Sequence, residues 1–242
     1  MFIVNALKKH PAVMNDDILR ACKNFLPDER IKILDPFAGI GTTAEYFTEH
    51  DVVGVEIEKE WASQNKNTIC GDSLVEIPKL GKFDAIITSP CYGNRMADDF
   101  NQSKENTRKY ITYKHFLERK LTEGTTANLH FGRKNKLYEE FHKNIWKVSV
   151  DSLKDEGLFI LNCKDFISNG EVMKVTKWHI NTLKSFGLTH VKTVKVKSKG
   201  MRFGANYNLR LDYEYVVCLK KLSRSQRFKS SSAHKGFSEM KS

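Results

Sequence analysis

The sequence has no CxxC cysteine pair and no long apolar run, and these absences exclude several classes of protein. Its five cysteines are odd in number and scattered over 242 residues, which argues against a disulfide framework or a zinc site and favours a reducing compartment. No stretch approaches the roughly 20 apolar residues that cross a bilayer. The opening MFIVNALKKH places apolar residues before charged ones, the reverse of a secretory signal. The histidines show no HExxH or paired spacing of the kind that binds metals. We therefore expect a cytoplasmic protein with no membrane or metal partner.

What the sequence does contain is an excess of positive charge. It has 40 Lys and Arg against 29 Asp and Glu, a formal net charge of +11. A balance of this size favours polyanionic partners, nucleic acid first. Hydrophobic residues make up 40% and aromatic residues 11% of the chain, so the body is expected to be globular rather than disordered.

Short apolar runs alternate with helical patterns from residue 31 onward, which is typical of β-α-β units and a largely parallel sheet. The last two apolar runs lie close together and predict an antiparallel pair at one edge. A glycine at position 187 is expected to end the last helix. The expected strands are 31–34, 52–57, 83–88, 157–163, 191–197 and 213–221, and the expected helices are 16–25, 42–50, 137–153 and 171–186.

Two segments interrupt this alternation. Residues 95–143 hold eleven Lys or Arg and seven Phe or Tyr and are too long for an ordinary connection, so we expect an insertion there. Its cations and aromatic rings fit target recognition on a nucleic acid, and a solvated helical insertion is an equal alternative. The tail, 223–242, has seven serines and little apolar content, so we expect it to be disordered.

A glycine-rich turn follows the first expected strand, in the sequence DPFAGIGTT that starts at Asp35. Gly39 and Gly41 let the backbone bend and approach a ligand, and the helix starting near Thr42 offers free N–H groups to an anionic group. Glu56 ends the next strand about 20 residues on, where nucleotide folds place an acid on ribose hydroxyls. The turn and the acid together indicate an adenosine-containing ligand.

Asp72, in the sequence CGDS, follows a further strand end and could accept from an adenine amino group. The sequence has no GKS or GKT step after its glycines, which argues against a nucleoside triphosphate held by a P-loop. The ligand is therefore expected to be an adenosine derivative without a triphosphate.

A second motif, TSPCYGNR, directly follows the strand at 83–88. Parallel sheets bind ligands beyond the carboxyl ends of their strands, so this loop is expected beside the glycine turn. The turn resembles motif I of the S-adenosylmethionine-dependent DNA amino-methyltransferases, and Ser89-Pro90-Cys91-Tyr92 resembles their motif IV, (D/N/S)-P-P-(Y/F/W). The sequence HPA at 10–12 resembles their motif X, and the region TSPCYGNRMADDFN to NTRKY is similar to a phage-type subgroup. The resemblance covers residues 8–220.

This resemblance implies a Rossmann-like sheet of seven strands, mostly parallel, with an antiparallel edge hairpin and an insertion after the fourth strand. It implies a methyltransferase domain over 1–222 that includes the insertion at 95–143, and S-adenosylmethionine as cofactor. The residues that it assigns to the cofactor are Asp35, Phe37, Ala38, Gly39, Gly41 and Thr42 at the methionine part, His10 and Pro11 on the carboxylate side, Glu56 at the ribose, Asp72 with Ser73 at the adenine, and Ile57 as a further contact.

Motif IV has a chemical rationale of its own. An exocyclic base amine is a poor nucleophile because its lone pair is delocalised into the ring. Two acceptors, the Ser89 hydroxyl and the Pro90 carbonyl, would draw the nitrogen toward tetrahedral geometry, and proline leaves its carbonyl free to point inward. Tyr92 is expected to stack on the base. Such a base must first leave the duplex. The predicted reaction is transfer of a methyl group to an exocyclic amine, with cytosine N4 favoured over adenine N6 because the family's cytosine-N4 group most often has serine at this position.

Several alternatives stay open. Cys91 replaces the family's second proline and follows Pro90 as the nucleophile of cytosine-C5 methyltransferases does, but the chain lacks their ENV and QxR motifs, so a small apolar role is favoured. RNA or a protein amide is an alternative substrate. A methylase-like protein that binds DNA without transferring methyl groups is a non-enzymatic alternative.

Basic residues in the later loops are expected to contact DNA. A homodimer and a cognate restriction nuclease, as in restriction-modification systems, are open as partners. The expected location is the cytosol of a bacterium or of a phage-infected host. The residues expected to contact nucleic acid are Arg95, Lys195, Lys197, Lys199 and Arg202.

Overall fold

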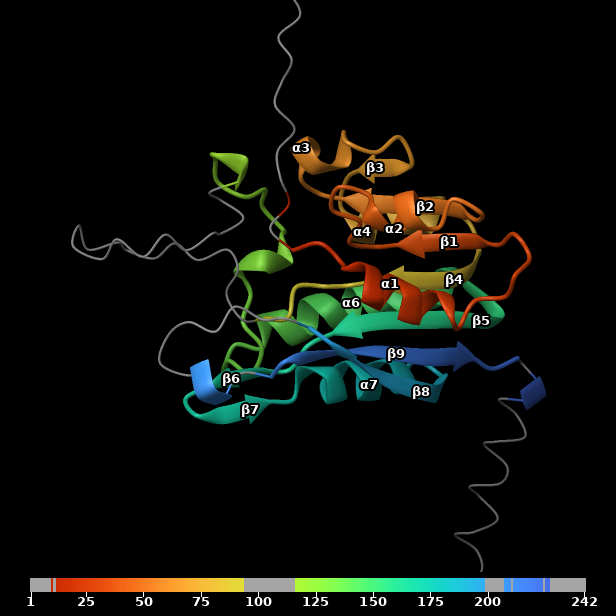
Figure 1. Ribbon diagram of the computed structural model, residues 1–242. Helices are drawn as coiled ribbons and strands as arrows, with labels where there is room; N and C mark the ends of the chain where they lie inside the picture. The colour runs from red at the N-terminus through yellow and green to blue at the C-terminus, as the bar shows by residue number, and fades with distance from the viewer. Residues whose placement is uncertain are drawn as a thin grey trace, which may run out of the picture.

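A seven-stranded sheet forms the centre of the molecule (Figure 1) in the computed structural model, which describes residues 10, 12–93, 116–198, 207–209, 211–223 and 225–226. The strand order is β3-β2-β1-β4-β5-β9-β8. Strands β1 to β5 are parallel, and β9 is antiparallel to both β5 and β8. The strands are β1 (Lys32–Asp35), β2 (Asp51–Glu56), β3 (Thr68–Cys70), β4 (Phe83–Thr88), β5 (Leu153–Cys163), β8 (Leu188–Lys197) and β9 (Tyr213–Lys221). The predicted fold class is confirmed.

Helices cover both faces of this sheet (Figure 1), because its central strands are apolar on both sides. Adjacent residues of β1 show the division, since Ile33 belongs to one buried cluster and Leu34 to the other. The Ile33 cluster includes residues of α1 (Asp16–Lys23) and α2 (Thr42–Tyr46). The Leu34 cluster includes residues of α6 (Leu137–Ser152) and α7 (Val175–Ser185) and is contacted by α4 (Ser73–Glu76). Helix α3 (Lys59–Ala62) follows β2.

The structure corrects the predicted helix over residues 171–186 at its beginning. Residues Glu171–Met173 form strand β7, which pairs with β6 (Phe166–Ser168), and α7 starts only at Val175. The hairpin loop is Asn169-Gly170, with φ of +51° and +79°. Asn-Gly is the preferred pair for a two-residue hairpin in which both residues have positive φ. The hairpin could therefore have been predicted from this pair in the sequence. Gly187 ends α7 as predicted, with φ of +89°.

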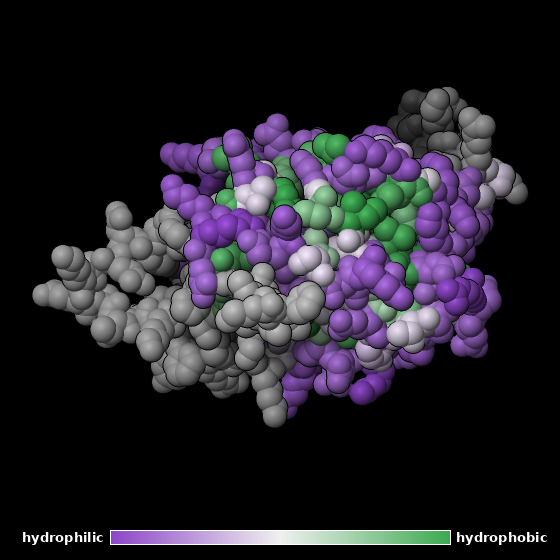
Figure 2. Space-filling model, turned by 90° about the horizontal axis from the view of Figure 1, so that it is seen from above, coloured by the Kyte–Doolittle hydropathy of each residue, from purple (hydrophilic) through white to green (hydrophobic). Residues whose placement is uncertain are grey.

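The surface seen along the β3 edge is mostly hydrophilic, with a band of apolar side chains between hydrophilic ones (Figure 2). In the described part of the chain, no helix combines the length and apolar character that crossing a bilayer requires.

Candidate active site

Asp35 joins the two predicted motifs at the carboxyl ends of β1 and β4. Its carboxylate is buried and accepts from Thr43 Oγ1 at 2.6 Å, Thr88 Oγ1 at 2.8 Å and the Phe37 backbone N–H at 3.1 Å. Burial raises the pKa of Asp35, and these three hydrogen bonds oppose the rise. Thr88 directly precedes Ser89, so the motif IV loop lies beside the glycine turn, as expected. Asp35 thus acts by holding the two loops together.

The glycine turn rests directly on β2. Gly39 and Gly41 have φ of +55° and +87°, a backbone conformation that favours glycine, and Thr42 begins α2 immediately afterwards. Ala38 is buried, and its Cβ would lie only 2.5 Å from a Cβ placed on Gly54 of β2. The absence of a side chain at Gly54 therefore lets the turn approach the sheet.

The Phe37 side chain packs against α6. Its half-buried ring contacts Phe141, His142 and Trp146 of α6, with ring centroids 6.3, 5.8 and 5.9 Å away. This side chain therefore anchors the glycine turn to α6, on the face of the sheet that α6 and α7 cover.

Two carboxylates lie at the ends of neighbouring strands, as the sequence predicts. Glu56 Oε2 accepts from the Gly39 N–H and Glu56 Oε1 from the Glu58 N–H, both at 2.9 Å. Burial raises the pKa of Glu56 to about 7. A carboxylate has about four acceptor positions, so two are left for a ligand such as a ribose diol.

Asp72 caps α4, where its Oδ1 accepts from the Leu74 N–H at 2.9 Å. Ser73 is buried and donates its hydroxyl to the Pro36 carbonyl at 2.6 Å. Ser73 therefore ties α4 to the glycine turn. The Asp72 carboxylate, which is only partly buried, keeps further acceptor positions.

His10 covers the glycine turn. A Cβ placed on Gly39 would lie 3.4 Å from its ring, and the ring meets Trp61 edge-on with centroids 4.3 Å apart. Burial lowers the pKa of His10 to about 4, so the imidazole is neutral at pH 7. Pro11, the other residue expected on this side, lies outside the described residues.

Part of the insertion packs around Trp61, the residue that His10 contacts. Leu117 and Ala127 are buried against Trp61, and Cys91 and Ile40 contact the same cluster. Gly124 lies over Ile57, whose Cδ1 would be 3.8 Å from a Cβ at position 124. Residues 116–136 of the predicted insertion thus pack beside Trp61 and Ile57, whereas its last residues, 137–143, belong to helix α6. Residues 94–115, including Arg95, lie outside the described residues.

A buried acid that sequence reasoning missed holds the insertion in place. The Glu58 side chain is 1% exposed and accepts from Arg119 Nη2 at 2.7 Å, from the Thr122 N–H at 2.9 Å and from Thr122 Oγ1 at 2.8 Å. Arg119 also binds Glu60, with Nε 2.8 Å from Oε1. The alternation of acids in EIEKE could have signalled an ion pair.

Behind motif IV lies a polar network from the ends of β5 and β9. Ser89 Oγ is 2.9 Å from Asn162 Oδ1, and the Tyr92 hydroxyl is 3.0 Å from Glu214 Oε2 and 3.1 Å from Asn162 Oδ1. Burial, followed by the nearby Glu214, raises the pKa of Tyr92 well above 10, so this hydroxyl is a donor. Sequence reasoning missed both Asn162 and Glu214. A lone polar residue in the apolar run at 157–163 was the available signal for the asparagine.

The other side of motif IV is held by α6 and α7. Trp146 Nε1 donates to His179 Nδ1 at 2.9 Å, and burial lowers the pKa of His179 well below 6.5. The neutral ring must then carry its proton on Nε2, which lies 3.0 Å from the Tyr138 hydroxyl. Tyr138 in turn donates to the Cys91 carbonyl at 2.7 Å. This chain of donors fixes the backbone of the loop.

Two of the predicted DNA-contacting lysines lie on the edge strand β8. Lys195 and Lys197 are exposed and pair in register with Tyr215 and Tyr213. Lys195 Nζ lies 4.6 Å from the centre of the Tyr213 ring. Because Tyr215 also pairs with Cys163 at the carboxyl end of β5, these lysines lie at the same end of the sheet as Ser89. Lys199 and Arg202 lie outside the described residues.

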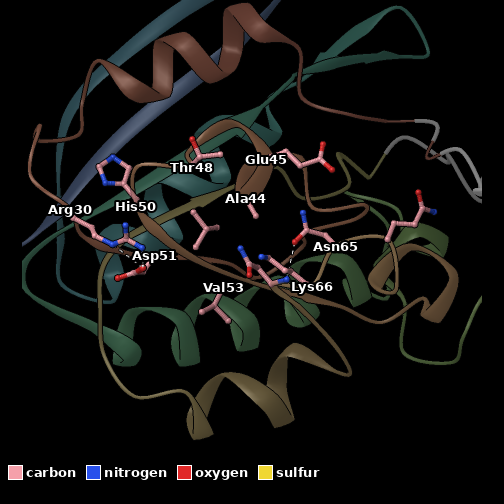
Figure 3. A pocket seen from close by; sticks show the side chains of 12 residues that line it. Arg30, Ala44, Glu45, Thr48, His50, Asp51, Val53, Asn65 and Lys66 are labelled. Carbon is pink, nitrogen blue, oxygen red and sulfur yellow. Dashed lines mark hydrogen bonds and ion pairs between the residues drawn. The ribbon is translucent and has the colours of Figure 1, made fainter.

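A hollow of about 850 Å³ lies elsewhere, along α2 toward the amino ends of β1 and β2 (Figure 3). Arg30 and Asp51, which line it, form an ion pair with each other. Asn65 enters it from the α3 side and lies against Gly41. The hollow contains none of the predicted site residues. Among the described residues, no cluster of three or more His, Cys, Asp or Glu is arranged to hold a metal ion.

Comparison with known proteins shows the fold. No family model and no curated protein matches the chain. The N-methyltransferase NodS from Bradyrhizobium japonicum WM9 matches 85% of this chain and 94% of its own, with a TM-score of 0.51 and 8% identity. A methyltransferase from Pyrococcus furiosus matches 90% of this chain and 89% of its own, with a TM-score of 0.50 and 18% identity. The chain has the Rossmann-like fold of methyltransferases. At these identities, the likeness concerns the fold alone.

Proposed function

We propose that the chain is an S-adenosylmethionine-dependent DNA methyltransferase that acts on an exocyclic base amine. The observation that carries the proposal is the hydrogen bond of 2.8 Å between Thr88 and Asp35. It brings Ser89 and Pro90 to the glycine turn, so that the predicted amine acceptors adjoin the predicted cofactor edge. In a methyltransferase fold, this adjacency is what direct transfer between two bound substrates requires.

The described residues fit S-adenosylmethionine. The glycine turn offers backbone close to the ligand, Glu56 has acceptor positions left for ribose hydroxyls, and Asp72 has the same for an adenine amine. The His10 ring covers Gly39 and is itself contacted by Trp61. When bound, the cofactor supplies an electrophilic methyl group.

At the target amine, the chain contributes acceptors and position. Ser89 Oγ and the Pro90 carbonyl would accept from the two N–H groups, which directs the nitrogen lone pair toward the cofactor edge. Asn162 and Tyr138 hold the loop that carries them from opposite sides. Catalysis then relies on preorganised geometry and hydrogen bonding. Tyr92 would stack on the base through its half-buried ring.

DNA as substrate rests on charge and its placement. The net charge is +11, and Lys195 and Lys197 lie at the end of the sheet that carries Ser89. Cytosine N4 is the proposed target atom, because serine heads motif IV here as it most often does in the family's cytosine-N4 group. Cys91 contacts an apolar cluster around Trp61, which favours a packing role over nucleophilic attack on cytosine C5.

Labelled S-adenosylmethionine tests the proposal when it is incubated with pools of DNA, RNA and protein. We expect label in DNA, and mass spectrometry of its nucleosides should show N4-methylcytosine. Ser89→Ala should lower the rate strongly. The exposed Ser185→Ala, which removes only a hydrogen bond to the Thr182 carbonyl, should not. Label confined to RNA or protein would refute DNA as substrate, and 5-methylcytosine would refute the amine as target.

A further inference from the structure

Glu214 lies where the hydrogen bonds behind motif IV converge. Its side chain is 14% exposed and projects from β9. Oε2 is 3.0 Å from the Tyr92 hydroxyl and 3.2 Å from Asn162 Nδ2, and Oε1 is 2.7 Å from Ser198 Oγ and 4.0 Å from Lys164 Nζ. Tyr92, Asn162 and Ser198 can each donate a hydrogen bond to this carboxylate, which only accepts, and Lys164 adds a positive charge nearby.

Glu214 fixes the orientation of the Asn162 amide. Asn162 is 1% exposed, and its Nδ2 donates to Glu214 Oε2 and to the Tyr215 carbonyl at 3.3 Å. Both partners are acceptors without a proton, so a flipped amide would face its oxygen toward two other oxygens. Asn162 Oδ1 must therefore point toward Ser89 and Tyr92, as an acceptor.

Acceptor strength and distance then select one arrangement of the remaining protons. Tyr92 has a single hydroxyl proton, and the carboxylate of Glu214 is a stronger acceptor than the amide oxygen of Asn162. With that proton on Glu214, the Ser89 hydroxyl can donate to Asn162 Oδ1 at 2.9 Å or to the Tyr92 oxygen at 3.2 Å, and the contact with Asn162 is the shorter. Either way, the Ser89 proton is used within the network. Ser89 then donates inward, and its lone pairs face the site.

We infer that Glu214 is a positioning residue that makes Ser89 a hydrogen-bond acceptor toward the target. This inference deepens the proposed function and rests on it, since it requires a target that presents an N–H group. An exocyclic amine provides such a group, whereas a carbonyl oxygen or a ring carbon does not.

The test compares two variants of the full-length protein, Glu214→Met and Glu214→Gln. Methionine has a similar volume but no strong acceptor, so the Tyr92 proton should turn to Asn162 and displace Ser89. Glutamine keeps an oxygen that can accept from the Tyr92 hydroxyl and from Asn162 Nδ2. We expect kcat for methyl transfer to fall at least about tenfold in Glu214→Met, the worth of one hydrogen bond. KM for S-adenosylmethionine should be nearly unchanged in both variants, and kcat nearly unchanged in Glu214→Gln.

Combining Tyr92→Phe with Glu214→Met tests whether Glu214 acts by accepting the Tyr92 proton or only by supporting the structure. Phenylalanine keeps the ring but has no proton to compete for Asn162 Oδ1. The double variant Tyr92→Phe with Glu214→Met should therefore recover most of the lost kcat, whereas two structural defects would add. Failure of this recovery overturns the inference. If Glu214→Met does not fold, as thermal unfolding would show, a large kcat loss in Glu214→Gln overturns it instead.

The outcomes distinguish this inference from the proposed function. Wild-type label in DNA with unchanged kcat in Glu214→Met overturns the inference alone. Label only in an RNA amine or a protein amide refutes DNA as substrate, and the same variants then test Glu214 on that substrate. A 5-methylcytosine product, or no transfer to any pool, overturns both.

Discussion

Replacing Arg119 with methionine should open the insertion over the cofactor edge. The guanidinium is the cation beside Glu58, a carboxylate that is 1% exposed. Methionine keeps much of the aliphatic length of arginine but cannot pair with the acid. Glu58 would then keep only the two donors of Thr122. Part of the free-energy cost of removing its charge from water would no longer be offset.

The free energy lost in Arg119→Met depends on how far the ion pair is exposed to water. Removing one partner of a fully buried ion pair costs about 3–5 kcal/mol, and hydrogen bonds to charged groups contribute about 1.5–3 kcal/mol. Arg119 is 35% exposed, so water screens part of the interaction. We therefore expect closure of the segment 116–128 to lose about 1–3 kcal/mol, which corresponds to about a 5- to 150-fold increase in its open fraction.

Amide hydrogen exchange measures this opening directly, because the Thr122 N–H donates to Glu58 at 2.9 Å. Exchange at Thr122 should accelerate by that factor in Arg119→Met, and the affinity for S-adenosylmethionine should fall, since the same segment contacts Trp61. Arg30→Met is the matched control. Its ion pair with Asp51 is 64% and 58% exposed, so water screens it and exchange at Thr122 should stay at the wild-type rate. Wild-type exchange at Thr122 in Arg119→Met would refute this account of the insertion.

Three further predictions concern the cofactor edge and the basic strand. Because the pKa of Glu56 is raised to about 7, its carboxylate forms as pH rises through 7; calorimetry should show S-adenosylmethionine binding strengthen from about pH 6 to 8 in wild type and not in Glu56→Gln. The raised pKa also contributes folding stability that is complete below pH 4.5 and is lost as pH rises through about 7. The midpoint temperature of thermal unfolding should therefore fall in wild type relative to Glu56→Gln between those pH values. Gly54→Ala should cost about 1–3 kcal/mol by overpacking and weaken cofactor binding, whereas Gly187→Ala, with no atom within 4 Å, should cost about 1 kcal/mol and leave binding intact. Lys195→Ala and Lys197→Ala should each reduce the salt slope of DNA binding by about 0.9, and unchanged slopes would show that neither contacts a phosphate.

Local patterns were sufficient to predict most of the fold. The strands at 83–88 and 213–221 were predicted with the observed bounds, because continuous apolar runs between turn residues mark buried strands. The short strand β3, Thr68–Cys70, has only three residues and no buried side chain, so its composition carries little signal. Its presence depends instead on pairing with β2.

The candidate site likewise combines residues that local patterns indicate with residues that they do not. Asp35, Gly39 and Ser89 stand in short motifs, so sequence alone could propose them as site residues. The groups that support the motif IV loop come from far along the chain: Asn162 is 73 residues from Ser89, and Glu214 is 122 residues from Tyr92. Such contacts are created by strand order, which no local pattern of a single sequence contains.

Cys91 stands where the motif IV that this loop resembles has a second proline. A second proline would restrict the backbone of the loop by itself, and cysteine does not. Here the Cys91 carbonyl accepts from the buried Tyr138 hydroxyl, which is oriented by His179 and Trp146. The backbone at Cys91 is thus restricted by a chain of hydrogen bonds from two helices. Because this chain and the network of Glu214 hold the loop from opposite sides, Ser89 can be fixed in place although only one of the two prolines is present.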